Sequence, residues 1–154
     1  RSQCPVISVQ THAKKIGFNN IVLPVDNSDH SRQKVFHALI LAKHYGSKIH
    51  ILGILGDGED PNKFEIKMDQ MQAFFEKNEI LFSRKTITGK NHAALTIDYA
   101  VGLNADLIMI MTDQDPEGIF LSPYAQQIVN HSKTPVMSIT PKVHPENFSW
   151  DLTY

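Results

Sequence analysis

The sequence predicts an α/β fold: an open, doubly wound sheet of five parallel strands with helices on both faces. The first observation is that short apolar runs alternate with segments of helical periodicity along the 154 residues. This alternation is typical of a parallel sheet that is covered on both faces. The second observation is the composition, because 42% hydrophobic and 20% charged residues suit one globular domain with its own core.

The first strand and the first helix are expected at residues 20–26 and 31–45. The run NIVLPVD is apolar and ends in the turn cluster DNSDHS, which indicates a buried strand followed by a helix start. Pro24 has no N–H to donate, so it argues against full pairing near the end of this strand. One apolar helix face follows at helical spacing: Val35, Ala38, Leu39 and Ala42. Gly46 is a natural C-terminal stop for this helix.

The middle of the chain contains the second and third strands, expected at residues 48–55 (KIHILGIL) and 80–88 (ILFSRKTIT). The flexible acidic loop GDGEDPN follows the second strand. Between the two strands, four apolar side chains recur at steps of four, three and four residues: Phe64, Met68, Met71 and Phe75. This spacing predicts one buried face of a helix.

The last third of the chain completes the alternation. Three more elements are expected, namely a helix at 92–103, a strand at 105–111 and a strand at 134–139 (TPVMSI). Between the last two strands, Ser122 has the character of an N-cap, and Pro123 suits the first position of a helix that runs to about His131. Doubly wound sheets bind ligands beyond the carboxyl ends of their strands. The loops to search for chemistry are therefore residues 26–30, 56–61 and 112–121.

The order of these pieces resembles the universal stress protein family. The stretch IVLPVDNSDHSRQKVFHALILAKHYGSKIHILGI is similar to the opening strand, helix and second strand of such domains. ADLIMIM resembles the fourth strand, and AQQIVNHSKTPVMSI resembles the closing helix and strand. The resemblance implies an adenine nucleotide alpha hydrolase-like sheet with strand order 3-2-1-4-5, in a domain at residues 20–141. It also implies a stress-response module and makes an adenine nucleotide (ATP or AMP) the candidate cofactor.

The phosphate side of the implied nucleotide site departs from the family pattern. Nucleotide-binding members carry G-x2-G-x9-G-[ST], whose backbone N–H groups surround the phosphates. Thr112 and Asp115 occupy the positions of the first two glycines of this pattern. Ser122 and Pro123 occupy the positions of Gly-[Ser/Thr], and the segment between Asp115 and Ser122 is shorter than the pattern requires. Three acids would also face the phosphates: Asp113, Asp115 and Glu117. Each unscreened like-charge contact costs on the order of 1 kcal/mol or more, so this half of the site is expected to be degenerate.

The nucleoside side is closer to the family. Asp26 matches the aspartate at the end of the first strand, and Asn27 replaces the usual glycine beside it. The residues that the resemblance implies at the ligand are Pro24, Val25, Asp26, Asn27, Thr112 and Ser122. An alternative for this turn is structural, with Asn27 or Ser28 capping the following helix.

The chain also carries its last strand twice. CPVISV and TPVMSI align without a gap, at an offset of 135 − 5 = 130 residues, about one universal stress domain. We therefore expect residues 1–10 to be the last strand of a preceding domain, residues 11–19 a linker and residues 142–154 a tail. Universal stress domains resemble one another in dimerising through the fifth strand. The resemblance therefore implies that residues 5–9 pair antiparallel with residues 135–139. The partner would be a homodimer mate or a tandem-domain pseudo-dimer mate.

Charge and motifs exclude several functions. A net charge of -1, from 15 basic and 16 acidic residues, argues against nucleic-acid and anionic-membrane binding. The single cysteine and the absence of a leader indicate the cytoplasm. The acidic loops lack EF-hand spacing, so solvated loop acids are favoured over a metal site. No nucleophile–base motif is present, which favours a non-enzymatic module over the alternative, a nucleotide-hydrolysing enzyme of related fold.

Overall fold

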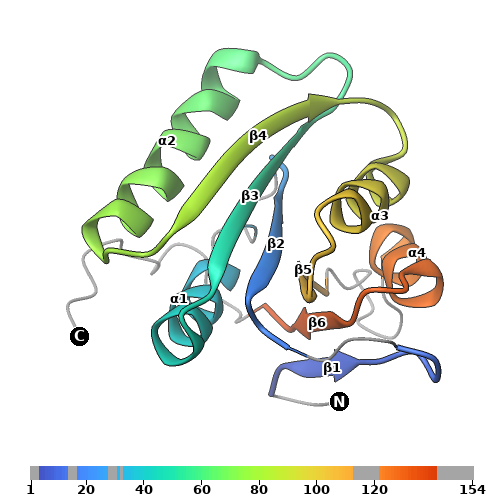
Figure 1. Ribbon diagram of the computed structural model, residues 1–154. Coiled ribbons are helices and arrows are strands. Elements are labelled where there is room, and N and C mark those ends of the chain that lie inside the picture. Colours follow the sequence, from blue (N-terminus) through green and yellow to red (C-terminus); the bar gives the residue numbers. More distant parts are fainter. Residues whose placement is uncertain (1–3, 14–16, 28–30, 32, 113–121, 142–154) are drawn as a thin grey trace.

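A twisted six-stranded sheet forms the centre of the computed structural model, with helices on both of its faces (Figure 1). The structure describes residues 4–13, 17–27, 31, 33–112 and 122–141. The strands are β1 (Val6–Ser8), β2 (Asn20–Val25), β3 (Lys48–Leu55), β4 (Phe82–Thr88), β5 (Leu107–Met111) and β6 (Val136–Ile139). The helices of the described residues are α1 (Lys34–Tyr45), α2 (Pro61–Lys77), α3 (His92–Gly102) and α4 (Pro123–His131).

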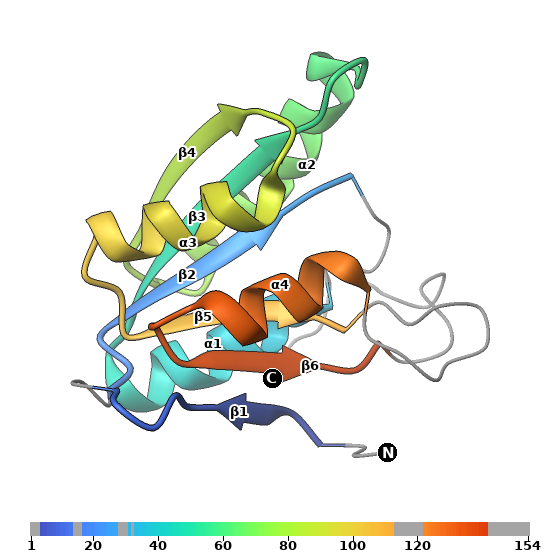
Figure 2. The same cartoon turned by 90° about the vertical axis from the view of Figure 1, so that its right-hand side faces the viewer.

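The strand order is β1-β6-β5-β2-β3-β4. The five strands from β2 to β6 are parallel, and their order is the predicted 3-2-1-4-5. The prediction of a five-stranded sheet is one strand short, because β1 adds a sixth, antiparallel strand at the edge beside β6 (Figure 2). The expected antiparallel pairing is present within this chain, with Ile7 opposite Met137 at its centre.

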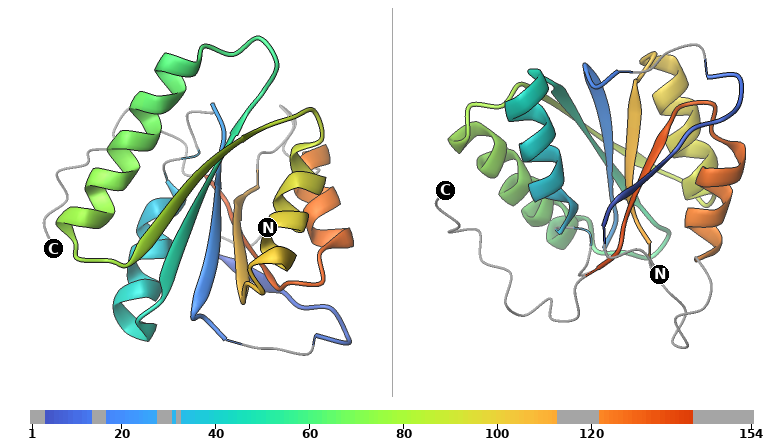
Figure 3. Two further views of the ribbon diagram at one scale, coloured as in Figure 1. Left: turned by 45° about the horizontal axis from the view of Figure 1, so that its top comes forward. Right: turned by 90° about the horizontal axis from the view of Figure 1, so that it is seen from below.

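The sheet separates two hydrophobic cores, one for each pair of helices (Figure 3). On the first face, α1 and α2 pack on the sheet, and the predicted helix face is fully buried there: Phe64, Met68, Met71 and Phe75. On the other face, α3 and α4 lie side by side and bury Ala100 and Ile128 among others. Strands with apolar side chains on both faces explain the continuous apolar runs in the sequence.

The element boundaries follow from local chemistry. Gly46 ends α1 in the left-handed region, with φ of 66°, and its N–H donates to the Ala42 carbonyl. Pro24 is accommodated because the pairing of β2 with β5 covers only Ile21 and Val22, while the pairing with β3 continues to the strand's end. The strand therefore carries its proline where the β5 side needs no N–H donor.

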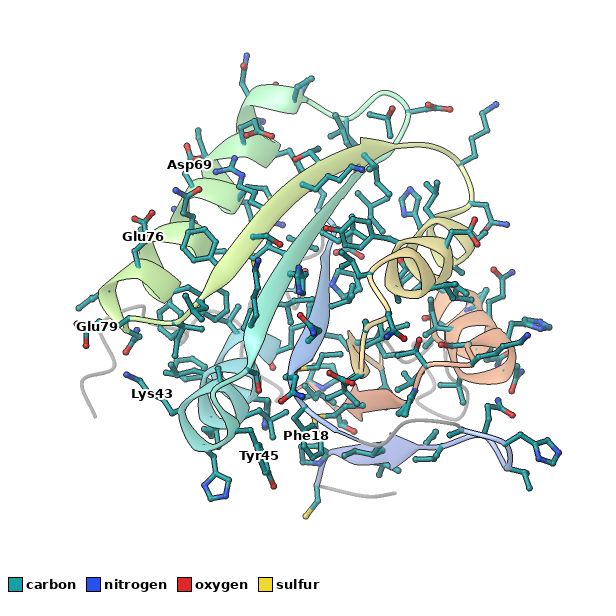
Figure 4. The ribbon with its side chains drawn as sticks, in the orientation of Figure 1. Phe18, Lys43, Tyr45, Asp69, Glu76 and Glu79 are labelled. Carbon is teal, nitrogen blue, oxygen red and sulfur yellow. The ribbon has the colours of Figure 1, made fainter. Side chains whose placement is uncertain are left out.

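Helix α1 begins at Lys34, three residues later than predicted. Its N-cap is Gln33, whose side chain makes no capping hydrogen bond. The suggestion that Asn27 caps this helix is therefore wrong, since Gln33 occupies the N-cap position. At the other end of the same helix, Phe18 stacks on Tyr45 with ring centroids 4.7 Å apart (Figure 4).

A buried histidine joins three strands. His50 of β3 contacts Ser83 Oγ of β4 through Nδ1 at 2.7 Å and Asn20 Oδ1 of β2 through Nε2 at 2.9 Å. Burial lowers the pKa of His50 below its usual 6.5, and the nearby Lys48 lowers it further. The neutral imidazole is therefore the form that the fold favours. No helix of the described residues is long and apolar enough to cross a membrane.

Candidate functional site

Five of the six predicted site residues lie at the carboxyl ends of β2 and β5, in the middle of the sheet, whereas Ser122 lies at the start of α4. These two strands are neighbours in the sheet, although β3, β4 and the intervening helices lie between them in the sequence. Such a reversal of strand order is where doubly wound folds bind ligands. Pro24 and Val25 are buried in β2, Asp26 is half-buried at its end, and Asn27 is exposed. Asp26 and Asn27 are thus the two residues of β2's end with surface for a ligand.

A buried lysine reaches the end of β2 from the neighbouring helix. Lys67 of α2 is 7% exposed, and its Nζ donates to the Asp26 carbonyl at 3.0 Å. The Asp26 N–H donates to Ser31 Oγ at 3.4 Å. The backbone of Asp26 is thereby fixed from two sides, and a cation is placed beside the half-buried carboxyl residue.

Sequence reasoning missed Lys67, although a signal was present. Lys67 lies three residues after Phe64 and four before Met71, on the apolar face of α2. A lysine on such a face buries its stem and must satisfy its ammonium group at the end. The carboxyl end of a parallel strand supplies a free carbonyl for this purpose.

Thr112 lies directly after β5, and its polar groups form hydrogen bonds within the protein. Its backbone N–H donates to the Ile139 carbonyl at 2.9 Å, and its hydroxyl donates to the same carbonyl at 3.2 Å. Its Oγ1 also lies 3.5 Å from Thr140 Oγ1. With only 6% of its surface exposed, Thr112 extends the β5–β6 ladder beyond its last residue pair.

The hydroxyl group of Ser122 also bonds within the protein, in the capping role that the sequence predicts. It is the N-cap of α4, and its Oγ accepts a hydrogen bond from the Ala125 N–H at 3.2 Å. Pro123 occupies the first helical position and offers no N–H of its own. The start of α4 therefore has one backbone donor removed and another already bonded.

Two acids of the loop after β3 have structural roles. The Glu59 carboxylate accepts from the Gly56 N–H at 2.7 Å, and Asp60 caps α2 by accepting from the Asn62 N–H at 2.9 Å. Within the described residues, no three His, Cys, Asp or Glu side chains are grouped as a metal ion would require. The predictions for Ser28, Asp113, Asp115 and Glu117 fall outside the residues that the structure describes.

Known structures share this architecture. A hypothetical protein whose biochemical function was assigned from its structure superposes with a TM-score of 0.72 at 15% identity, covering 82% of this chain and 99% of its own. A universal stress protein from Archaeoglobus fulgidus gives 0.71 at 16% identity, covering 93% of this chain but 52% of its own. A universal stress protein in complex with cAMP gives 0.63 at 17% identity, covering 84% and 98%. The chain thus spans about half the length of the second of these.

These likenesses are below 25% identity and establish the fold alone. No curated protein sequence matches the chain. The model of the universal stress protein family, in contrast, matches residues 17–139, which is most of the sequence. The chain therefore belongs to the universal stress protein family.

Proposed function

We propose that this protein is a non-enzymatic, regulatory stress-response module whose nucleotide site has lost its phosphate half. The observation that carries the proposal is the bonding of Thr112 and Ser122. Both stand where nucleotide-binding relatives are expected to present glycine N–H groups, and both use their hydroxyl groups within the protein. A phosphate would have to break the Ser122 cap, which is worth about 1 kcal/mol.

Two features of the sequence support the same conclusion. Pro123 removes an N–H from the helix start that would otherwise face the phosphates. The segment between Thr112 and Ser122 contains three acids, one of them (Asp115) where a glycine is expected, so it adds negative charge on the side where a triphosphate would lie. Both effects weaken triphosphate binding more than nucleoside binding, because they act on the phosphate side only.

An enzymatic role receives little support from the described residues. Ser83 and His50 form a serine–histidine contact, as a nucleophile and base would. His50 is 5% exposed, however, and its second nitrogen bonds to Asn20 on a third strand. The three side chains join neighbouring strands near their amino ends and do not lie at the carboxyl ends where Asp26 is found.

One alternative is favoured by a specific observation. A structural neighbour is a universal stress protein in complex with cAMP, and Asp26 keeps a half-buried position at the end of β2. An adenine nucleotide with a single phosphate, or a nucleoside, would use this side and make little demand on the phosphate side.

Isothermal titration calorimetry with adenosine, AMP and MgATP tests the proposal. We expect no saturable heat with MgATP at millimolar concentration. Saturable heat with adenosine or AMP that is lost in Asp26→Asn, but retained in the exposed-surface control Asp98→Asn, would establish the alternative. Tight MgATP binding would refute the loss of the phosphate half.

We also propose that residues 5–9 and 135–139 form the edge through which universal stress domains of this protein pair, in a homodimer or a tandem pseudo-dimer. The similarity of CPVISV and TPVMSI, which share a proline, a valine and a serine in register, supports this. The coverage of this chain by its structural neighbours also supports this proposal. The longer Archaeoglobus protein superposes on 93% of this chain, whereas a neighbour that is itself covered to 99% superposes on 82%. The longer match is expected if β1 corresponds to part of a preceding domain.

Disulfide trapping tests this interface. Ile7 and Met137 are opposite each other in the register, so both are changed to cysteine in a Cys4→Ser background. A cross-link between chains indicates a strand-exchanged homodimer, and a cross-link within one chain indicates the pseudo-dimer arrangement. Absence of any cross-link, with both thiols free to an alkylating reagent, refutes the pairing.

A further inference from the structure

A cavity lies at the opposite end of the sheet from Asp26. It has a volume of about 770 Å³ and is enclosed by three segments: residues 10–13 after β1, residues 100–105 at the end of α3, and residues 130–135 at the end of α4. Residues 105 and 134–135 directly precede β5 and β6, so the cavity is at the amino ends of these strands. We call it the linker cavity. Its volume is within the range of small-molecule sites, about 300–1,000 Å³.

The lining of the linker cavity has one sign of charge. Among the described residues that line it none is acidic, whereas the protein as a whole has slightly more acids than bases. Lys133, His12 and His131 supply basic or imidazole groups, and the amide side chains of Asn104 and Asn130 add further donors. Such a set of donors suits a ligand with anionic oxygen acceptors.

The helix ends at the cavity do not cancel this preference. The carboxyl ends of α3 and α4 have partial negative charge through their free carbonyls. In α3, the carbonyls of Ala100 and Val101 accept from the N–H groups of Ala105 and Asn104. In α4, the Val129 carbonyl accepts from the Gln10 side chain at 3.3 Å. Several of the terminal carbonyls are thus already bonded within the protein.

One part of the cavity lining is fixed by buried hydrogen bonds, whereas another part continues from a short edge strand. Ser132 is 2% exposed, and its hydroxyl exchanges two hydrogen bonds with the backbone of Thr134. The opposite wall, residues 10–13, is joined to β1, which contributes only three residue pairs to the sheet edge. Val6 and Ile7 of that strand are 46% and 40% exposed, so little burial holds it.

We infer that the linker cavity binds a small organic anion carrying a phosphate or carboxylate group, and that this ligand fastens residues 4–13 to the domain. A ligand that bridges Lys133 and His131 to the wall at residues 10–13 binds only when that wall is in place. By linkage, it stabilises the docked wall over the detached one, and with it the β1–β6 pairing.

The site is tested by ¹⁵N NMR titration of the intact chain with inorganic phosphate and with citrate, at ionic strength held constant with chloride. We expect saturable shifts at the amides of residues 11–13 and 131–134, and none at residues 25–27. Saturation by phosphate, by citrate or by both supports the site and identifies the group it accepts. Absence of saturation with either probe overturns the proposal.

Two variants separate a built site from general attraction to basic residues. Lys133→Gln is expected to weaken binding about tenfold, as the loss of one charged hydrogen bond does. Val101→Trp fills the cavity from an exposed position on α3 and should abolish binding. Lys43→Gln, on α1 at the other face of the sheet (Figure 4), should change nothing. Equal losses in Lys43→Gln and Lys133→Gln would overturn the site.

Hydrogen exchange tests the fastening. Under saturating probe, the amide of Ile7 should exchange several-fold more slowly, because detachment of β1 then requires loss of the ligand. Binding that leaves exchange at Ile7 unchanged would overturn the claim that the ligand holds residues 4–13. Shifts that instead require a macromolecule from the cell, with both probes inactive, would assign the surface to a different partner and refute the small-anion site.

Discussion

Gly53 lies in β3 beneath α2, and replacing it by alanine should loosen the helix that carries Lys67. A Cβ at this position would lie 2.8 Å from Phe64 Cε1 and 2.9 Å from Met68 Cε, closer than real Cβ atoms come to other atoms. Phe64 and Met68 are fully buried, so neither can move outward freely. Overpacking of this kind costs about 1–3 kcal/mol. The lower backbone entropy of alanine in the unfolded chain returns about 0.5–1 kcal/mol, which leaves a net loss of roughly 0–2.5 kcal/mol, with about 1 kcal/mol at the centre of this range.

The same substitution at Gly102 is the matched control. Gly102 is the last residue of α3, and a Cβ there would meet nothing within 4 Å. Gly102→Ala should therefore stabilise the protein by about 0.5–1 kcal/mol. Urea unfolding at equilibrium measures both free energies of unfolding. Opposite signs are expected for the two variants. If Gly53→Ala were as stable as Gly102→Ala, the close packing of α2 on β3 would be refuted.

Three further predictions concern the buried polar groups. The pKa of His50 is lowered from 6.5 chiefly by burial. The unfolded state therefore gains a proton before the folded state does as pH falls, so the His50 contribution to stability is constant above about pH 6.5 and declines below it. An NMR titration of the His50 ring should have its midpoint below 6.5, and a midpoint at or above 6.5 would contradict this. Lys67→Met removes the ammonium bonded to the Asp26 carbonyl and should lower the free energy of unfolding by about 1–3 kcal/mol, measured by urea unfolding; the exposed control Lys77→Met should change it by less than about 0.5 kcal/mol. Ser122→Ala removes the N-cap of α4 and should cost about 0.5–2 kcal/mol; an unchanged thermal midpoint would show that this cap contributes nothing.

The sequence predicted the sheet and its cores well because periodicity reports burial. The apolar face of α2 and the run at β3 were identified from spacing alone, and the structure buries both. The helix boundary at Lys34 was missed because the polar cluster DNSDHS contains several good capping residues. The N-cap is instead Gln33, which lies beyond this cluster, and spacing alone could not locate it.

The sequence was less informative about the candidate site, because its contacts are long-range. Lys67 meets Asp26 across 41 positions, and Thr112 meets Ile139 across 27. The hydroxyl of Thr112 could equally have faced a ligand, and only the pairing of β5 with β6 determines that it does not. The linker cavity is a stronger case, since three separate segments form it and none carries a motif.

The loss of the phosphate half can be tested most directly by native mass spectrometry of the purified protein, with the mass of any released small molecule determined after denaturation. The bonding of Thr112 and Ser122 predicts that no nucleoside triphosphate is released. A stoichiometric amount of ATP bound to the protein would contradict it, because the Ser122 cap and the acids between Thr112 and Ser122 would then not prevent the binding of a triphosphate.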